Sequence, residues 1–182
     1  MAGPAGRRPR LVTGWVLLVL LAAGGLPNPA SALSPRDGGP VAFVGGSRIA
    51  LSDVATFHCH DRDYPIIRCF LTPEQRTAEE AQVALAAASE ALIPGGAALL
   101  DPFVRWYRDP NSGGPSYTAY VSQPDLASIG WDNLISSFTP LNGGHPVWWS
   151  LANQTGTKWD WGLAQASYLG SADNQFSSVA KV

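Results

Sequence analysis

The stretch Asp132-Asn133-Leu134-Ile135-Ser136-Ser137 recurs later in the chain as Asp173-Asn174-Gln175-Phe176-Ser177-Ser178. A second matched pair precedes these two signatures. Tyr107 and Trp149 are each followed seven positions later by a glycine (114 − 107 and 156 − 149). The separation between aromatic residue and signature is also nearly the same in the two copies (132 − 107 against 173 − 149). Two features at matched spacing indicate a duplicated unit of about forty residues.

The residues around the repeat predict an all-β region. From Leu99 onward, aromatic and β-branched residues alternate with clusters of Gly, Pro, Asn and Asp. Turn signals at intervals of about 8–12 residues are typical of a sandwich of short strands. Within each signature we expect the apolar residue, Ile135 or Phe176, to be buried.

At these residues the chain resembles the βγ-crystallin superfamily. The Greek key of that family opens with a hairpin of the form aromatic-x6-Gly, and its calcium-binding members carry Asn/Asp-Asn/Asp-x-x-Ser/Thr-Ser further along the same motif. Two such motifs make one domain. The resemblance covers residues 102–182 and implies a mainly β fold, a double Greek-key sandwich preceded by a smaller segment.

The resemblance also implies two calcium sites, each assembled from both motifs. Side chains of the second Asn/Asp and the first Ser would bind the ion, together with the carbonyl of the residue that follows the Asn/Asp and a hairpin carbonyl. Carried over, these positions are Asn133, Leu134, Ser136 and Arg108, then Asn174, Gln175, Ser177 and Ser150, while Asp132 and Asp173 supply the negative charge. Oxygen donors suit Ca²⁺, and neither signature holds the Cys or His that zinc or copper prefers.

The chain departs from the family pattern in its hairpins. Ser112 and Gln154 replace the second aromatic residue, and Arg108 and Ser150 stand where an acidic residue is common. Few carboxylates and a nearby cation predict weak binding, with Kd of about 10⁻⁵–10⁻³ M, and favour the second site. The alternative is that Asx and Ser residues here only form turns.

Residues 1–32 have the features of a secretory signal peptide. Arg7, Arg8 and Arg10 precede an uncharged, largely apolar run, and Ala30-Ser31-Ala32 supplies a small-x-small cleavage pattern. Cleavage would remove three arginines and leave a net charge of −5 (12 − 3 = 9 basic against 14 acidic residues). We therefore expect a secreted protein that binds neither nucleic acid nor, after cleavage, a membrane.

Residues 33–101 are predicted to form an N-terminal segment with its own features. It starts with a Ser/Pro/Gly linker over 33–40. Because the chain is predicted to be exported, Cys59 and Cys69 indicate a disulfide, with a redox or metal pair as the alternative. A helix is predicted over 73–93, where Thr72 and Gln75 have the spacing of a capping box.

Several other patterns allow two interpretations. His58 and His60 could bind a metal or have a surface or packing role, and Trp131, Trp148, Trp149, Trp159 and Trp161 could bind carbohydrate or fill the core. No motif for a nucleophile and its base is present, so we expect no enzyme. The alternatives to a calcium-binding structural or stress-related protein are two. One is a peptidase inhibitor using the loops 109–115 and 140–146, and the other is a toxin-type or cell-wall-binding module using 41–100.

Overall fold

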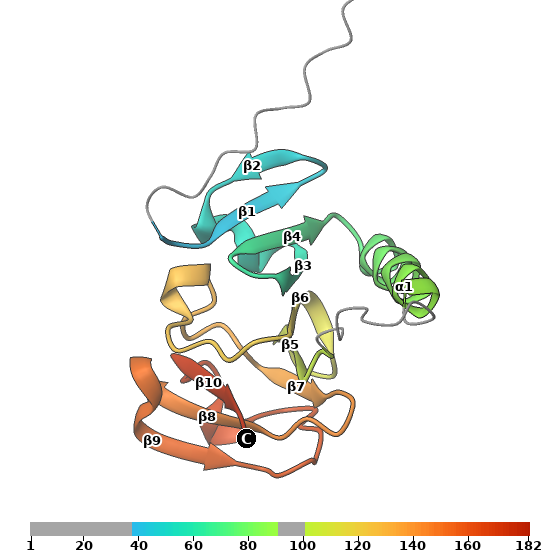
Figure 1. The fold of residues 1–182 in the computed structure, drawn as a ribbon. Helices are drawn as coiled ribbons and strands as arrows, with labels where there is room; N and C mark the ends of the chain where they lie inside the picture. Colours follow the sequence, from blue (N-terminus) through green and yellow to red (C-terminus); the bar gives the residue numbers. More distant parts are fainter. Residues whose placement is uncertain (1–37, 91–100) are drawn as a thin grey trace, which may run out of the picture. The chain divides into compact units, whose positions relative to one another are not determined.

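The computed structural model describes residues 38–90 and 101–182, and its C-terminal strands form two copies of one arrangement (Figure 1). In each copy the first strand lies between the second and the last, giving the orders β6-β5-β7 and β9-β8-β10. The strands of the first copy are β5 (Val104–Asp109), β6 (Gly113–Ala119) and β7 (Ser137–Pro140). Those of the second are β8 (Pro146–Leu151), β9 (Thr155–Asp160) and β10 (Ser178–Lys181).

The third segment of each copy pairs with the last strand of the other copy. Gln123, after β6, forms an antiparallel bridge with Val179 in β10, and Ala166, after β9, forms one with Phe138 in β7. The third segment of each copy thus pairs with the sheet of the other copy, as in a pair of Greek keys. Each Greek key therefore depends on the other for one of its strand pairings. The predicted double Greek key is therefore confirmed.

The core between the two sheets is built from aromatic residues of both copies. Trp106 stacks on Tyr117 with ring centroids 4.7 Å apart, and Trp148 stacks on Phe176 at 4.8 Å. Phe176 and Ile135, the apolar residues of the two signatures, are fully buried as predicted. Trp131 and Trp148 are also fully buried, whereas Trp149, Trp159 and Trp161 are half-buried.

The N-terminal segment extends the sheet of the first Greek key. Its strands are β1 (Val41–Val44), β2 (Ser47–Ile49), β3 (His58–Asp63) and β4 (Ile66–Phe70). β3 pairs in parallel with β6, so the sheet has the order β2-β1-β4-β3-β6-β5-β7. Residues 37–182 thus belong to one compact unit. The domain boundary predicted at residues 101 and 102 stays a prediction, and the sheet contains strands from both sides of it.

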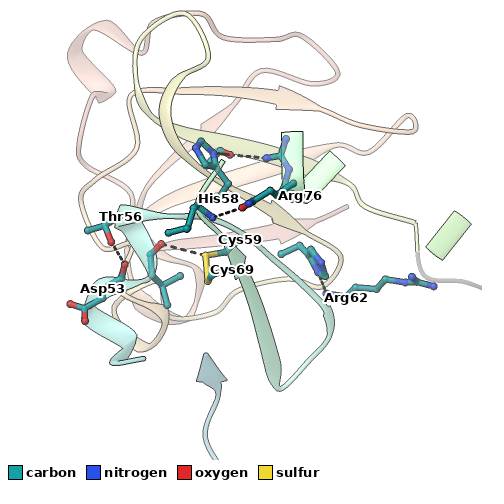
Figure 2. Close-up of a disulfide and its surroundings, with 12 residues drawn as sticks. Asp53, Thr56, His58, Cys59, Arg62, Cys69 and Arg76 are labelled. Atoms are coloured by element: carbon teal, nitrogen blue, oxygen red, sulfur yellow. Dashed lines mark hydrogen bonds between the residues drawn. A yellow bond between two sulfur atoms is a disulfide. The ribbon is translucent and has the colours of Figure 1, made fainter. Parts of the chain in front are cut away.

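The predicted disulfide is present and joins two neighbouring strands of this extension. Cys59 in β3 lies directly opposite Cys69 in β4, and the two are bonded. Both residues are buried, and Cys59 Sγ also contacts the Val54 carbonyl at 3.4 Å (Figure 2). Val54 lies in η1 (Leu51–Thr56), a short 3₁₀ helix; the others are η2 (Ala127–Ile129), η3 (Ala152–Gln154) and η4 (Gly170–Ala172).

The helix α1 (Pro73–Glu90) begins where the capping pattern predicts. Gln75 N donates to Thr72 Oγ1 at 3.3 Å, and Gln75 Oε1 accepts from Leu71 N at 3.1 Å. Positions 91–93 of the predicted helix lie outside the described residues. Within the described ranges, no helix combines the length and the apolar character needed to span a bilayer.

Charged side chains on α1 join the helix to the sheet. Glu80 accepts two bonds of 3.0 and 2.9 Å from Arg105 of β5, and Glu79 contacts His60 of β3 at 2.9 Å. Arg76 is 4% exposed and donates to Ser116 Oγ of β6 at 2.7 Å. Because these charges are paired and largely removed from water, losing one partner would leave the other unpaired.

Asp61 of β3 fastens the N-terminal extension to the first Greek key. This carboxylate is fully buried and accepts a 2.7 Å bond from the backbone N–H of Tyr120 and another from Gln123 Nε2. Burial raises the pKa of Asp61 to about 7, although both hydrogen bonds favour the charged form. The same Gln123 pairs through its backbone with β10, so Asp61 holds the crossing segment in place.

We predict that Asp61 makes stability fall as pH rises. Its pKa is higher in the folded chain than the value of about 4 expected in the unfolded chain, so its contribution is complete below about pH 4 and is lost through about pH 7. Relative to Asp61→Asn, the parent should lose on the order of a few kcal/mol across this range in urea unfolding. Exposed Asp101→Asn is the control, and parallel curves for parent and Asp61→Asn would contradict the prediction.

Candidate metal centre

In the first motif, the hairpin and the signature are held together by backbone and serine contacts. Ser136 N donates to the Tyr107 carbonyl at 3.0 Å. The hydroxyl of Ser137 donates to the Asp109 carbonyl at 2.7 Å and accepts from Ser112 N at 3.1 Å. The leading aromatic residue and the signature, which are far apart in sequence, are therefore in direct contact.

The second motif repeats each of these contacts. Ser177 N donates to the Trp149 carbonyl at 2.9 Å, and Ser178 Oγ donates to the Leu151 carbonyl at 2.7 Å. Gln154 N donates to Ser178 Oγ at 3.0 Å. The repetition shows that the second serine of each signature holds its hairpin, a role that the sequence reasoning missed. The signal available in the sequence was the second serine of each pair, which recurs in both copies although the resemblance gives a ligand role only to the first.

The hairpins reach this geometry through left-handed backbone positions. Asn111 and Ser112 have φ of 58° and 60°, and Asn153 and Gln154 have φ of 56° and 60°. Left-handed backbone is uncommon for residues other than glycine, so the serine contacts to residues 112 and 154 hold a turn that needs support. Ser112 and Gln154, which replace the aromatic residue of the family pattern, are thus held by hydrogen bonds from their backbone N–H groups to the hydroxyls of Ser137 and Ser178.

The two signature loops are bonded to each other across the domain. Asn133 N donates to the Phe176 carbonyl at 3.0 Å, and Asn174 N donates to the Ile135 carbonyl at 3.1 Å. Both asparagines have the same left-handed φ of 54°. Each loop is therefore positioned by the other motif.

One carboxylate oxygen in each loop is buried without a partner. Asp132 Oδ1 and Asp173 Oδ1 have almost no solvent contact and no hydrogen-bond donor among the described residues. The other oxygen of Asp132 accepts from Asn133 Nδ2 at 3.0 Å. A buried acceptor without a donor is costly unless a cation satisfies it. Two equivalent unpartnered oxygens therefore fit a bound cation in each loop.

The donor chemistry of the loops suits a hard cation. Asn133 and Asn174 are exposed and Ser136 is buried, while Ser177 is half-buried. The side-chain amide of Gln175 donates from Nε2 to the Ser171 carbonyl at 2.6 Å. The predicted calcium ligand at this position is the backbone carbonyl of Gln175, which this bond does not use. Within the described residues, no group of three His, Cys, Asp or Glu side chains is placed to hold a metal. These loops therefore offer Asn, Ser and carbonyl oxygens around one carboxylate each, which is a calcium-like donor set.

The two hairpins differ at the position after the aromatic residue. Ser150 Oγ accepts from Thr157 N at 2.9 Å inside its own hairpin. Arg108, in contrast, donates from Nη1 to the Ala55 carbonyl in η1 at 3.3 Å. η1 also contacts the chain just before the first signature, because a Cβ at Gly130 would clash with the Leu51 carbonyl oxygen. The N-terminal extension therefore touches the first loop region through η1.

Comparison with known proteins finds relatives only among solved structures: no family model and no curated protein matches the chain. The chain is 31% identical to a βγ-crystallin from an archaeon, covering 44% of this chain and 98% of that one with a TM-score of 0.40. A βγ-crystallin from Ciona intestinalis is 21% identical, with 43% and 98% covered and a TM-score of 0.41. A βγ-crystallin domain from Clostridium beijerinckii is 23% identical, with 43% and 95% covered and a TM-score of 0.40.

We predict that Ser137→Ala and Ser178→Ala each destabilise the fold by about 1–3 kcal/mol, because each removes two hydrogen bonds from a buried hydroxyl. Chemical unfolding in the absence of calcium measures this effect. Ser167→Ala, at an exposed position of the same domain, is the control and should change stability little. Equal stability of all three variants would show that the second serines do not hold the hairpins.

Proposed function

Since the chain belongs to the βγ-crystallin family through its C-terminal double Greek key, we propose that it is a secreted calcium-binding protein of that family. The proposal is carried by the matched pair of buried, unpartnered oxygens, Asp132 Oδ1 and Asp173 Oδ1. A single unsatisfied oxygen could be a local irregularity. Two at equivalent positions of a repeat indicate that both loops are built for the same ligand.

The proposed ligands in the first motif are Asp132, Asn133 and Ser136 with the carbonyls of Leu134 and Arg108. Those in the second motif are Asp173, Asn174 and Ser177 with the carbonyls of Gln175 and Ser150, and each site would draw on both motifs. The contacts from Ser136 to Tyr107 and from Ser177 to Trp149 support these sets, since they bring each hairpin next to its signature. Calcium takes 6–8 oxygen ligands, so water would complete each shell.

Bound calcium would act as a clip between the motifs. Each loop is anchored to the opposite motif by a backbone hydrogen bond, so an ion in either loop stabilises an arrangement in which both Greek keys are docked. A ligand that binds only the folded state stabilises it by about 2.7 kcal/mol at a hundredfold excess over Kd. We therefore assign a structural or stress-related role without enzymatic activity. The buried disulfide supports secretion, because such bonds persist outside the cytosol.

We predict that millimolar Ca²⁺ raises the melting temperature of the mature protein above its value in EDTA, with Mg²⁺ as the ionic-strength control. Calcium binding outside these loops would also raise it, so the loop assignment needs the variants below. An unchanged midpoint in Ca²⁺ would exclude the calcium role.

We predict that Asp132→Ala with Asp173→Ala abolishes this calcium-dependent rise but leaves the EDTA melt similar to that of the parent. The reason is that Asp132 Oδ1 and Asp173 Oδ1 have no donor to lose among the described residues, and the bond from Asn133 Nδ2 to Asp132 Oδ2 is exposed. Isothermal titration calorimetry measures the binding directly, and Asp101→Ala, at an exposed position outside both loops, is the matched control. If the double variant binds calcium like the parent, the assigned residues are wrong.

We further predict that Arg108→Gln tightens the weaker of the two sites by a few-fold and leaves the other unchanged. Arg108 follows the hairpin aromatic residue of the first motif, so its positive charge opposes a cation there. Lys158→Gln in β9 is the control for removing a positive charge elsewhere. Calorimetry at low and high salt separates this local effect from a change in net charge, because salt screens distant charges more strongly than close ones.

A further inference from the structure

A pocket of about 360 Å³ lies where the N-terminal extension, α1 and the hairpin of the first Greek key meet. His58 comes from β3, Pro73 and Arg76 from the first turns of α1, and Tyr107, Pro115 and Ser116 from β5 and β6. This pocket lies outside the residues assigned to calcium. It exists only because the extension and helix are added to the Greek keys.

The pocket contains a buried cation whose charge is only partly balanced. Arg76 is 4% exposed, and its Nε lies 3.3 Å from Glu80 Oε1 without forming a hydrogen bond. Both carboxylate oxygens of Glu80 already accept from Arg105 Nη2. Two guanidinium groups thus share one carboxylate, and Glu79, the neighbouring acid, contacts His60 instead. Burial, followed by the charge of Arg105, lowers the pKa of Arg76, while the charge of Glu80 acts in the opposite direction.

Ser116 orients the two basic groups of the pocket. Its hydroxyl accepts from Arg76 Nη1 at 2.7 Å and lies 3.0 Å from His58 Nδ1. Because Arg76 can only donate, the hydroxyl proton is available for His58 Nδ1. When the hydroxyl donates to Nδ1, the neutral His58 ring carries its proton on Nε2 and offers a second donor. Burial, followed by the Arg76 charge, lowers the pKa of His58, in agreement with a neutral ring.

The walls of the pocket favour an anion with an apolar body. Among the described residues that line it, none is acidic. Glu74, an acid whose charge acts on His58, is exposed on the first turn of α1. Two proline rings and the Tyr107 ring provide apolar surface around the donors. A carboxylate can accept from a guanidinium and an imidazole while its alkyl chain lies against such rings.

We propose that this pocket binds a carboxylate that carries a short aliphatic chain. A free short-chain acid and the C-terminus of a peptide both present such a carboxylate, so either could be its source. Arg76 supplies the charge, His58 supplies the second donor, and the prolines with Tyr107 contact the chain. The site is independent of the calcium sites proposed above, so failure of either proposal leaves the other standing.

The test is a titration of the mature protein followed by NMR of its imidazole signals. The chain has three histidines, and His145 is a built-in control because it lies in the loop before β8 rather than in the pocket. Sodium acetate, propionate and butanoate are compared with sodium phosphate and sodium chloride at equal ionic strength and pH. Acetylated dipeptides ending in alanine or alaninamide distinguish a peptide source from a free acid.

The expected result is a saturable shift of His58, with no matching shift of His145, and affinity that rises up to about fourfold for each buried methylene. Arg76→Met should weaken butanoate binding at least tenfold, whereas Arg48→Met, at an exposed position on β2, should not. If Arg76→Met does not fold, the parent titration still decides. Shifts of His58 and His145 that follow ionic strength alone, or phosphate binding as tight as that of butanoate, would overturn the proposal.

Discussion

The structure depends on the pair of reciprocal hydrogen bonds between the two signature loops, from Asn133 N to Phe176 O and from Asn174 N to Ile135 O. These bonds cross between motifs in the same way as the third segments do at Gln123 and Ala166. As a result, neither Greek key can form its loop alone, and the two fully buried apolar residues of the signatures are anchored in one shared core. The loops that would hold calcium are therefore part of the folding unit rather than additions to it.

The N-terminal extension is joined to the Greek keys in two ways. Ala42, Val54 and Ile67 belong to the same hydrophobic core as the aromatic residues of the Greek keys. The extension and α1 also make buried polar contacts around Asp61, Glu80 and Arg76. Such contacts add directionality, since each donor must meet its acceptor, and they cost stability if one partner is lost. They also place Arg76 beside Ser116, in the pocket that we propose to bind a carboxylate.

Much of the crystallin-type half could be predicted, because its information is local and repeated. The matched spacings defined the two units, alternation within the signatures predicted burial of Ile135 and Phe176, and the capping pattern at Thr72 located the start of α1. The parallel pairing of His58 with Ser116 could not be predicted, because it joins strands that are distant in sequence with no repeat to relate them. The burial of Arg76 on a helix was equally hidden, since charge in sequence usually indicates exposure. The role of Ser137 and Ser178 in holding the hairpins could not be predicted either, because it rests on their hydrogen bonds to the Asp109 and Leu151 carbonyls.

The central claim is that the two crossed loops form a pair of calcium sites. A crystal structure grown with calcium, with anomalous diffraction data, tests it most directly. One anomalous peak is expected in each loop, at about 2.3–2.6 Å from Asp132 Oδ1 and from Asp173 Oδ1. Ordered loops with no peak at either oxygen, or with a protein donor bonded to both, would contradict it.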